Sequence, residues 1–136
     1  MKKIFLFAFA AVALAACSDV KKNEKALLDH VIQMHDSVMT YDEQLMHNKM
    51  KLDTLIKTAD DTTKAKLNAM IIKLGKVDGD MEEWMQKFDP APQGKSHEYI
   101  MNYMNAQKIR IGRIDSMMRA AIKESGEYIK QKTATK

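Results

Sequence analysis

The apolar side chains of this chain recur at alternating steps of four and three residues along three long segments. The first stripe consists of Leu27, Val31, Met34, Val38, Tyr41, Leu45, Asn48, Leu52 and Leu55. The second consists of Leu67, Met70, Leu74, Val77, Met81, Trp84 and Phe88, and the third of Ile100, Met104, Gln107, Ile111, Ile114, Met118, Ala121, Ser125 and Tyr128. This spacing places one residue per turn on the same face of an α-helix, whereas a half-buried strand would alternate. We therefore predict three amphipathic helices.

Two breaks separate the three stripes. The segment 89–94 contains both prolines of the chain and cannot continue a helix. Short polar side chains cluster at residues 58–63, where Asp60 or Asp61 is placed to cap the next helix. Because both connections are short, consecutive helices should run antiparallel. The expected fold is all-α, an up-down-up antiparallel three-helix bundle.

The bundle should occupy residues 26–136, with helices at about 24–57, 62–88 and 96–131. The stripes should meet in its interior. The side chains that we expect at the centre of the core are Val31, Val38, Leu45, Leu52, Leu67, Leu74, Val77, Trp84, Phe88, Ile100, Ile111, Ile114 and Met118. Asn48 and Gln107 are polar positions on two stripes, and we expect them to fix the helix register or the oligomeric state at some cost in stability.

The first residues have the pattern of a secretory signal. Two lysines precede an uncharged apolar run over residues 4–14, which is too short to span a bilayer permanently. The run ends in Leu14-Ala15-Ala16-Cys17, which resembles the bacterial lipobox. The resemblance implies removal of residues 1–16, a diacylglycerol thioether on Cys17 and acylation of the new amino terminus. An ordinary secreted protein with a cysteine in its signal is the alternative.

Cys17 is the only cysteine, so the mature protein can form no internal disulfide. Residues 17–25 would be the lipidated cysteine and a polar tether to the membrane. Ser18 stands where inner-membrane lipoproteins of proteobacteria carry Asp, so we expect the outer membrane. Only Asp19 is acidic before Lys21, which favours the periplasmic face. The mature 120 residues carry a net charge of +2, too small to indicate nucleic-acid binding.

Methionine is unusually frequent, with twelve among 136 residues. Tight connections would place Met81 and Met85 opposite Val38 and Met34. They would place each residue of the third helix level with the residue about 66 positions earlier. One end of the bundle would then gather Met34, His35, Met39, Met81, Met85, Met101 and Met104.

This Met/His set suggests one cofactor. Thioether sulfur and imidazole suit Cu(I) or another soft metal, and His35 and Met39 are spaced to face one site. The alternative, which we favour, is that the methionines fill the core around Trp84 and that the protein holds no cofactor.

No catalytic constellation is evident in the sequence. The resemblance assigns Cys17 to the lipid, no serine stands in a glycine-flanked elbow, and there is no glycine-rich phosphate loop. We therefore predict that the protein is not an enzyme.

The segments 34–39 (Met-His-Asp-Ser-Val-Met) and 81–88 (Met-Glu-Glu-Trp-Met-Gln-Lys-Phe) are similar to recurring features of small Bacteroidota lipoproteins. Some of these are loosely labelled viral A-type inclusion proteins. The resemblance implies a lipidated helical bundle and transfers no catalytic residue. Two functions remain open. The protein is either a non-enzymatic envelope module that binds a protein partner or itself, or a periplasmic soft-metal binder. For the first, residues 95–136 supply a basic surface, with nine Lys and Arg against four acids.

Overall fold

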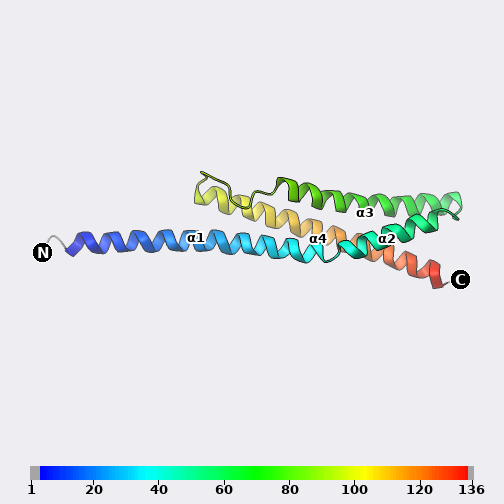
Figure 1. Cartoon of the computed structure of the whole chain (residues 1–136), viewed down its shortest axis with the longest axis horizontal. Helices are drawn as coiled ribbons and strands as arrows, with labels where there is room; N and C mark the ends of the chain where they lie inside the picture. Colours follow the sequence, from blue (N-terminus) through cyan, green and yellow to red (C-terminus); the bar gives the residue numbers. More distant parts are fainter. Residues whose placement is uncertain (1–3, 135–136) are drawn as a thin grey trace.

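The structure is a computed structural model that describes residues 4–134, with side chains from residue 19 onward. It contains four helices: α1 (Ile4–Met39), α2 (Asp42–Ile56), α3 (Asp61–Lys87) and α4 (His97–Ala134). In Figure 1, α2 continues roughly in the direction of α1, α3 runs back, and α4 runs forward again. The fold is therefore all-α, with three helical arms packed together, as the stripes predicted.

The first arm is divided between α1 and α2. The amide of Tyr41 donates to the carbonyl of Val38 at 3.0 Å, a tight turn that closes α1. The hydroxyl of Thr40 donates to the carbonyl of Ser37 at 2.7 Å and so competes with the helical backbone. Thus two helices replace the single one expected at 24–57.

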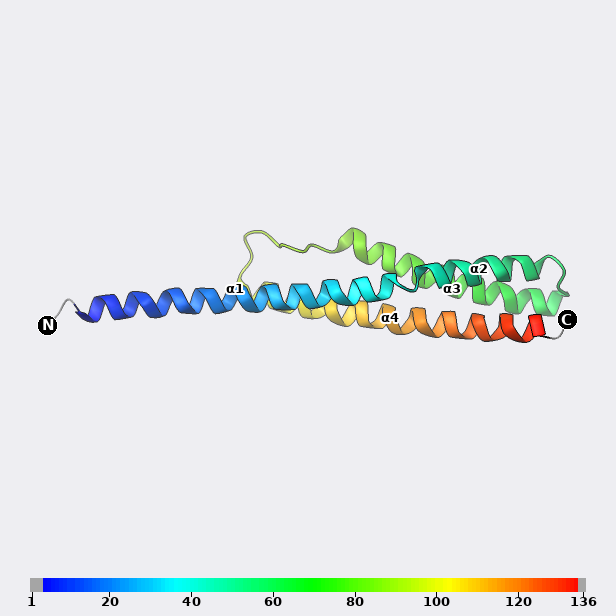
Figure 2. The same cartoon turned by 60° about the horizontal axis from the view of Figure 1, so that its bottom comes forward.

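Residues 17–25, expected to be a tether, lie within α1. The carboxylate of Glu24 lies 2.7 Å from Nδ1 of His97, at the start of α4. Lys25 forms an ion pair of 2.6 Å with Asp29, one turn along the helix. This part of the chain is rich in helix formers and is held to α4, so the expectation of a tether is corrected to a helix. The blue first part of α1 projects beyond the other helices (Figures 1 and 2).

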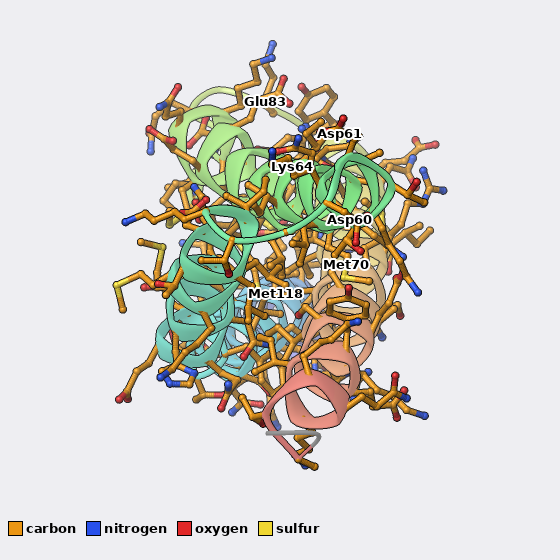
Figure 3. The ribbon with its side chains drawn as sticks, turned by 90° about the vertical axis from the view of Figure 1, so that its right-hand side faces the viewer. Asp60, Asp61, Lys64, Met70, Glu83 and Met118 are labelled. Atoms are coloured by element: carbon orange, nitrogen blue, oxygen red, sulfur yellow. The ribbon has the colours of Figure 1, made fainter. Side chains whose placement is uncertain are left out.

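The three stripes meet in the interior of the bundle. Figure 3 looks along the helices and shows Met70 and Met118 between them. Of the side chains expected in the core, the buried ones are Val31, Val38, Leu45, Leu52, Leu67, Leu74, Val77, Trp84, Ile111, Ile114 and Met118. Phe88 and Ile100 are half-buried. Burial of these apolar surfaces is the main source of stability, because no disulfide is available.

A buried polar cluster fixes α2 against α4. Nδ2 of Asn48 donates to Oγ of Ser125 at 2.8 Å and to the carbonyl of Ile122 at 3.0 Å. Nε2 of Gln44 donates to Oδ1 of Asn48 at 2.7 Å. The two bonds that cross to α4 favour this register of the helices, since a buried amide left without partners is costly.

The register of α4 differs from the expected one. Residues of α1 and α2 meet residues of α4 that lie 73 to 77 positions later, as in the pairs Glu24–His97 and Asn48–Ser125. The expected separation was about 66, from a tight connection between antiparallel helices. The connection is extended instead: Phe88, the residue after α3, has ψ 122°. Two prolines follow, and the chain turns back only at Gly94, where φ is 67°. As a result, α4 begins well beyond the end of α3 (Figure 2).

Candidate functional site: an aromatic hollow between α1 and α3

Aromatic rings from three helical arms form a continuous row. The ring of His35, on α1, stacks on Trp84 of α3 with centroids 5.6 Å apart. Trp84 stacks on Phe88 at 4.7 Å, and Phe88 on Tyr103 of α4 at 6.4 Å. Tyr99 ends the row, 6.3 Å from Tyr103. Stacked pairs of this kind each stabilise a fold by roughly 0.5–1.5 kcal/mol beyond the area that they bury.

A hollow of about 240 Å³ opens beside this row, and we call it the aromatic hollow. It is lined by Ile32, His35, Trp84, Met85 and Phe88. Trp84 is only 2% exposed, whereas Ile32 and Met85 are 39% and 42% exposed. The lining of the hollow therefore combines one buried aromatic side chain with accessible aliphatic side chains.

The polar atoms around the aromatic hollow are unequally satisfied. Nε1 of Trp84 donates to Oε1 of Gln107 at 2.9 Å, which explains the polar position on the third stripe. Nδ1 of His35 lies 3.1 Å from Oδ1 of Asp36. Nε2 of His35 is buried and has no hydrogen-bond partner among the described residues. Such an atom is a cost to the free protein that a bound group could relieve.

Charged residues lie on the outer surface near this site. Lys87 donates a hydrogen bond to Glu83, and Nη2 of Arg110 reaches Oε2 of Glu83 at 3.2 Å. The hydrogen bond and charge of Lys87, and then the charge of Arg110, hold the pKa of the Glu83 carboxyl below its usual range. Glu83 is at the periphery of the bundle in Figure 3. It is a solvated surface group, so this pKa shift does not indicate a catalytic acid.

The structure brings together only part of the expected soft-metal set. His35 and Met85 share the aromatic hollow. Met81 is buried in the core, and Met39 is 38% exposed. Met34 faces α4, where its Cε lies 3.3 Å from the position that a Cβ on Gly112 would take.

Met101 and Met104 do not join this end, and their expected position opposite His35 and Val38 is wrong. Met104 is buried and lines a different cavity, together with Leu28 of α1. The cause is the extended connection after Phe88, which shifts α4 by about two to three turns. Among the described residues, no group of three or more His, Cys, Asp or Glu is placed to hold a metal ion.

Sequence reasoning missed Ile32, Tyr99 and Tyr103. None of them lies on an apolar stripe, so none was expected in a cluster. A local signal was present at the start of α4, where Tyr99 and Tyr103 are one turn apart and face the same side of the helix. What could not be seen is that Phe88 continues this pair into the row, because that contact depends on the path of the connection.

The comparison with protein families supports the membrane anchor. Residues 1–18 match the description of a prokaryotic membrane lipoprotein lipid attachment site. The side chain of Cys17 lies outside the described side chains. No curated protein and no solved structure matches the chain. Within the described part of the chain, no helix has the length and apolar character needed to cross a membrane. The chain is thus a lipid-anchored bacterial lipoprotein with a helical body.

Proposed function

We propose that this lipoprotein is a non-enzymatic binding module of the cell envelope, and that its aromatic hollow receives an apolar segment of a partner protein. We place it in the outer membrane because Ser18 stands where inner-membrane lipoproteins carry Asp, and facing the periplasm because only Asp19 is acidic before Lys21. We also infer that it belongs with the small Bacteroidota lipoproteins that its helical segments resemble. The observation that carries the proposal is the aromatic hollow itself.

The size and lining of the hollow favour a protein side chain as the occupant. Its volume of about 240 Å³ lies below the roughly 300–1,000 Å³ of typical small-molecule sites. Buried aromatic residues surrounded by accessible apolar side chains are typical of the anchor points of protein interfaces, and methionine adapts its shape to a partner. Of the five lining residues, only His35 carries a titratable group, so the hollow offers no acid–base pair.

Site-specific photocrosslinking in intact cells tests this proposal. A benzophenone amino acid replaces Met85 at the rim of the hollow, or Ile72, which is 70% exposed elsewhere on α3. We expect one discrete protein adduct from position 85 and none from position 72. Equal adducts from both positions, or none from position 85, would contradict the proposal.

A second substitution shows whether the hollow itself makes the contact. With the crosslinker at position 85, Ile32→Lys places a charge in the hollow, and Ile109→Lys places the same charge on an exposed site of α4. We expect the first change to abolish the adduct and the second to leave it intact. Both positions are solvent-accessible, so neither change should unfold the bundle.

A soft-metal function is the second candidate, and one observation favours it. His35 and Met85 share the aromatic hollow, and Nε2 of His35 has no hydrogen-bond partner among the described residues. Imidazole nitrogen and thioether sulfur both bind Cu(I). Two donors from the protein would hold the ion with open positions.

Anaerobic Cu(I) titration separates this candidate from partner binding. The double variant His35→Ala, Met85→Ala is compared with the matched variant His47→Ala, Met50→Ala, whose two residues are exposed on α2. A metal protein should lose affinity only in the first variant. We expect instead that all three proteins bind Cu(I) equally weakly.

A further inference from the structure

A second and larger cavity lies at the end of the bundle nearest the lipidation site. It has a volume of about 520 Å³ and opens between the first arm, the proline-containing connection and the start of α4. We call it the anchor-side cavity. It is lined by residues 90–93 of the connection and by Lys21, Glu24, Lys25, Leu28, Ile100 and Met104. The cavity exists because α4 begins beyond the end of α3, so that only the extended connection covers the space between them.

Backbone position 17 of α1 falls on the helical face that includes positions lining this cavity. Positions 17, 21, 24 and 28 are separated by steps of four, three and four, which put them on one helical face. Positions 21, 24 and 28 all line the cavity, and α1 is continuous through them. The rise of the helix puts Leu28 about 16 Å from Cys17 along the axis, which is within the reach of a long acyl chain.

The chemistry of the cavity changes along this direction. The end nearer Cys17 carries the ammonium group of Lys21 and the paired Glu24, whose partner is His97. The far end is apolar and includes Leu28, Ile100 and Met104, with Met104 only 2% exposed. A charged end followed by an apolar end suits an acyl chain whose polar ester group stays at the charged end.

We propose that the anchor-side cavity holds one acyl chain of the lipid on Cys17. The chain folds back along α1 and leaves the remaining chains in the bilayer. The segment expected to be a flexible tether is part of α1, and its residues Lys21, Glu24 and Lys25 line the cavity. Two remaining chains are sufficient for stable anchoring, whereas a single chain would bind only marginally. This inference is independent of the aromatic hollow and of its partner.

Crosslinking through the lipid tests the proposal on the intact lipoprotein. Producing cells are fed a fatty acid with a diazirine near its methyl end, and their membranes are irradiated and digested with trypsin. We expect mass spectrometry to find the lipidated peptide 17–21 joined to the peptide 96–108, which contains Ile100 and Met104. The absence of any product on peptides of the cavity would overturn the proposal. A phospholipid adduct on 96–108 without the 17–21 peptide would also overturn it, because the occupant would then be a membrane lipid.

Filling the cavity provides the matched control. Ile100→Trp introduces a large side chain from α4, and Leu28→Trp introduces it from α1. We expect either change to remove most of the crosslinked product, while Ile109→Trp, at a position 66% exposed on α4, leaves its yield unchanged. Circular dichroism identifies any variant that fails to fold. Full retention of the product in folded Ile100→Trp and Leu28→Trp proteins would contradict the proposal.

Discussion

Asn48 is a polar side chain on the first apolar stripe, and it is 2% exposed. Its burial could be predicted from its stripe position, because it falls between Leu45 and Leu52 at helical spacing. Its partner could not be predicted. Ser125 is also a polar position on a stripe, but the contact between the two requires the true register of α4. At the scale of single residues, the sequence therefore shows which side chains are buried better than it shows what they touch.

Replacement of Asn48 tests the value of this cluster. Asn48→Ala removes two donated hydrogen bonds and leaves a void, so we expect the free energy of unfolding to fall by about 1–3 kcal/mol. Asn68→Ala is the control, because Asn68 is exposed on α3 and should change the stability by less than about 0.5 kcal/mol. Urea denaturation gives both values. Equal losses from the two variants would mean that the cluster does not stabilise the bundle.

Val38 tests the stripe itself. The side chain is 1% exposed, so Val38→Asp places an unpaired charge in the core, and we expect a loss of about 3–5 kcal/mol or complete unfolding. Ile109→Asp makes a similar change at a position that is 66% exposed. Its thermal unfolding curve should stay close to that of the unaltered protein. An unchanged curve for Val38→Asp would refute the assignment of the core.

At the scale of helices, the sequence predicted that three apolar stripes form helical arms, and it missed where two of them end or begin. The stripe passes through Tyr41 without interruption, so the break between α1 and α2 has no signal in the apolar pattern. The path after α3 depends on tertiary contacts, since the amide of Asp89 donates to the hydroxyl of Tyr103 at 2.8 Å. Local spacing carries no information about such a bond. The sequence therefore indicated that residues of the stripes would form part of the aromatic hollow, but not the path of the connection beside it.

The start of α3 should make the stability depend on pH. Oδ1 of Asp60 accepts a hydrogen bond of 2.8 Å from the amide of Thr63, and this bond lowers the pKa of the Asp60 carboxyl. The carboxylate is thus favoured in the folded state. Its contribution is complete above the ordinary pKa of about 3.9 and is lost as the pH falls through the lowered value.

Asp60→Asn keeps a capping side chain but removes this titration. We expect its stability to fall less than that of the unaltered protein as the pH drops below about 4.5. Asp61→Asn is the control, because the side chain of Asp61 is fully exposed next to the cap. Figure 3 labels both residues. Thermal melts across this pH range give the comparison. Identical pH profiles for Asp60→Asn and the unaltered protein would show that the titration of Asp60 does not cause the pH dependence of stability.

At the scale of the whole molecule, the stability of the helical body and its attachment to a membrane have separate origins. The body holds itself together by packing, and the lipid attachment site holds it to a membrane. We expect Cys17→Ser to abolish incorporation of labelled fatty acid and to move the protein from the membrane fraction to the soluble fraction. Circular dichroism of the released protein should still show a helical bundle. Membrane association that persists in Cys17→Ser protein from which residues 1–16 have been removed would mean that the helices themselves bind lipid.

Because α1 is continuous through residues 17–39, it fixes the distance between position 17 and the aromatic hollow. His35 follows Cys17 by eighteen residues, which is five full turns and about 27 Å of helix. A flexible linker would let the aromatic hollow sample a wide range of heights, whereas a helix presents it at one height and in one direction relative to the lipid. A membrane-bound partner would then be selected by how far its own apolar segment stands from the bilayer, as well as by the chemistry of that segment.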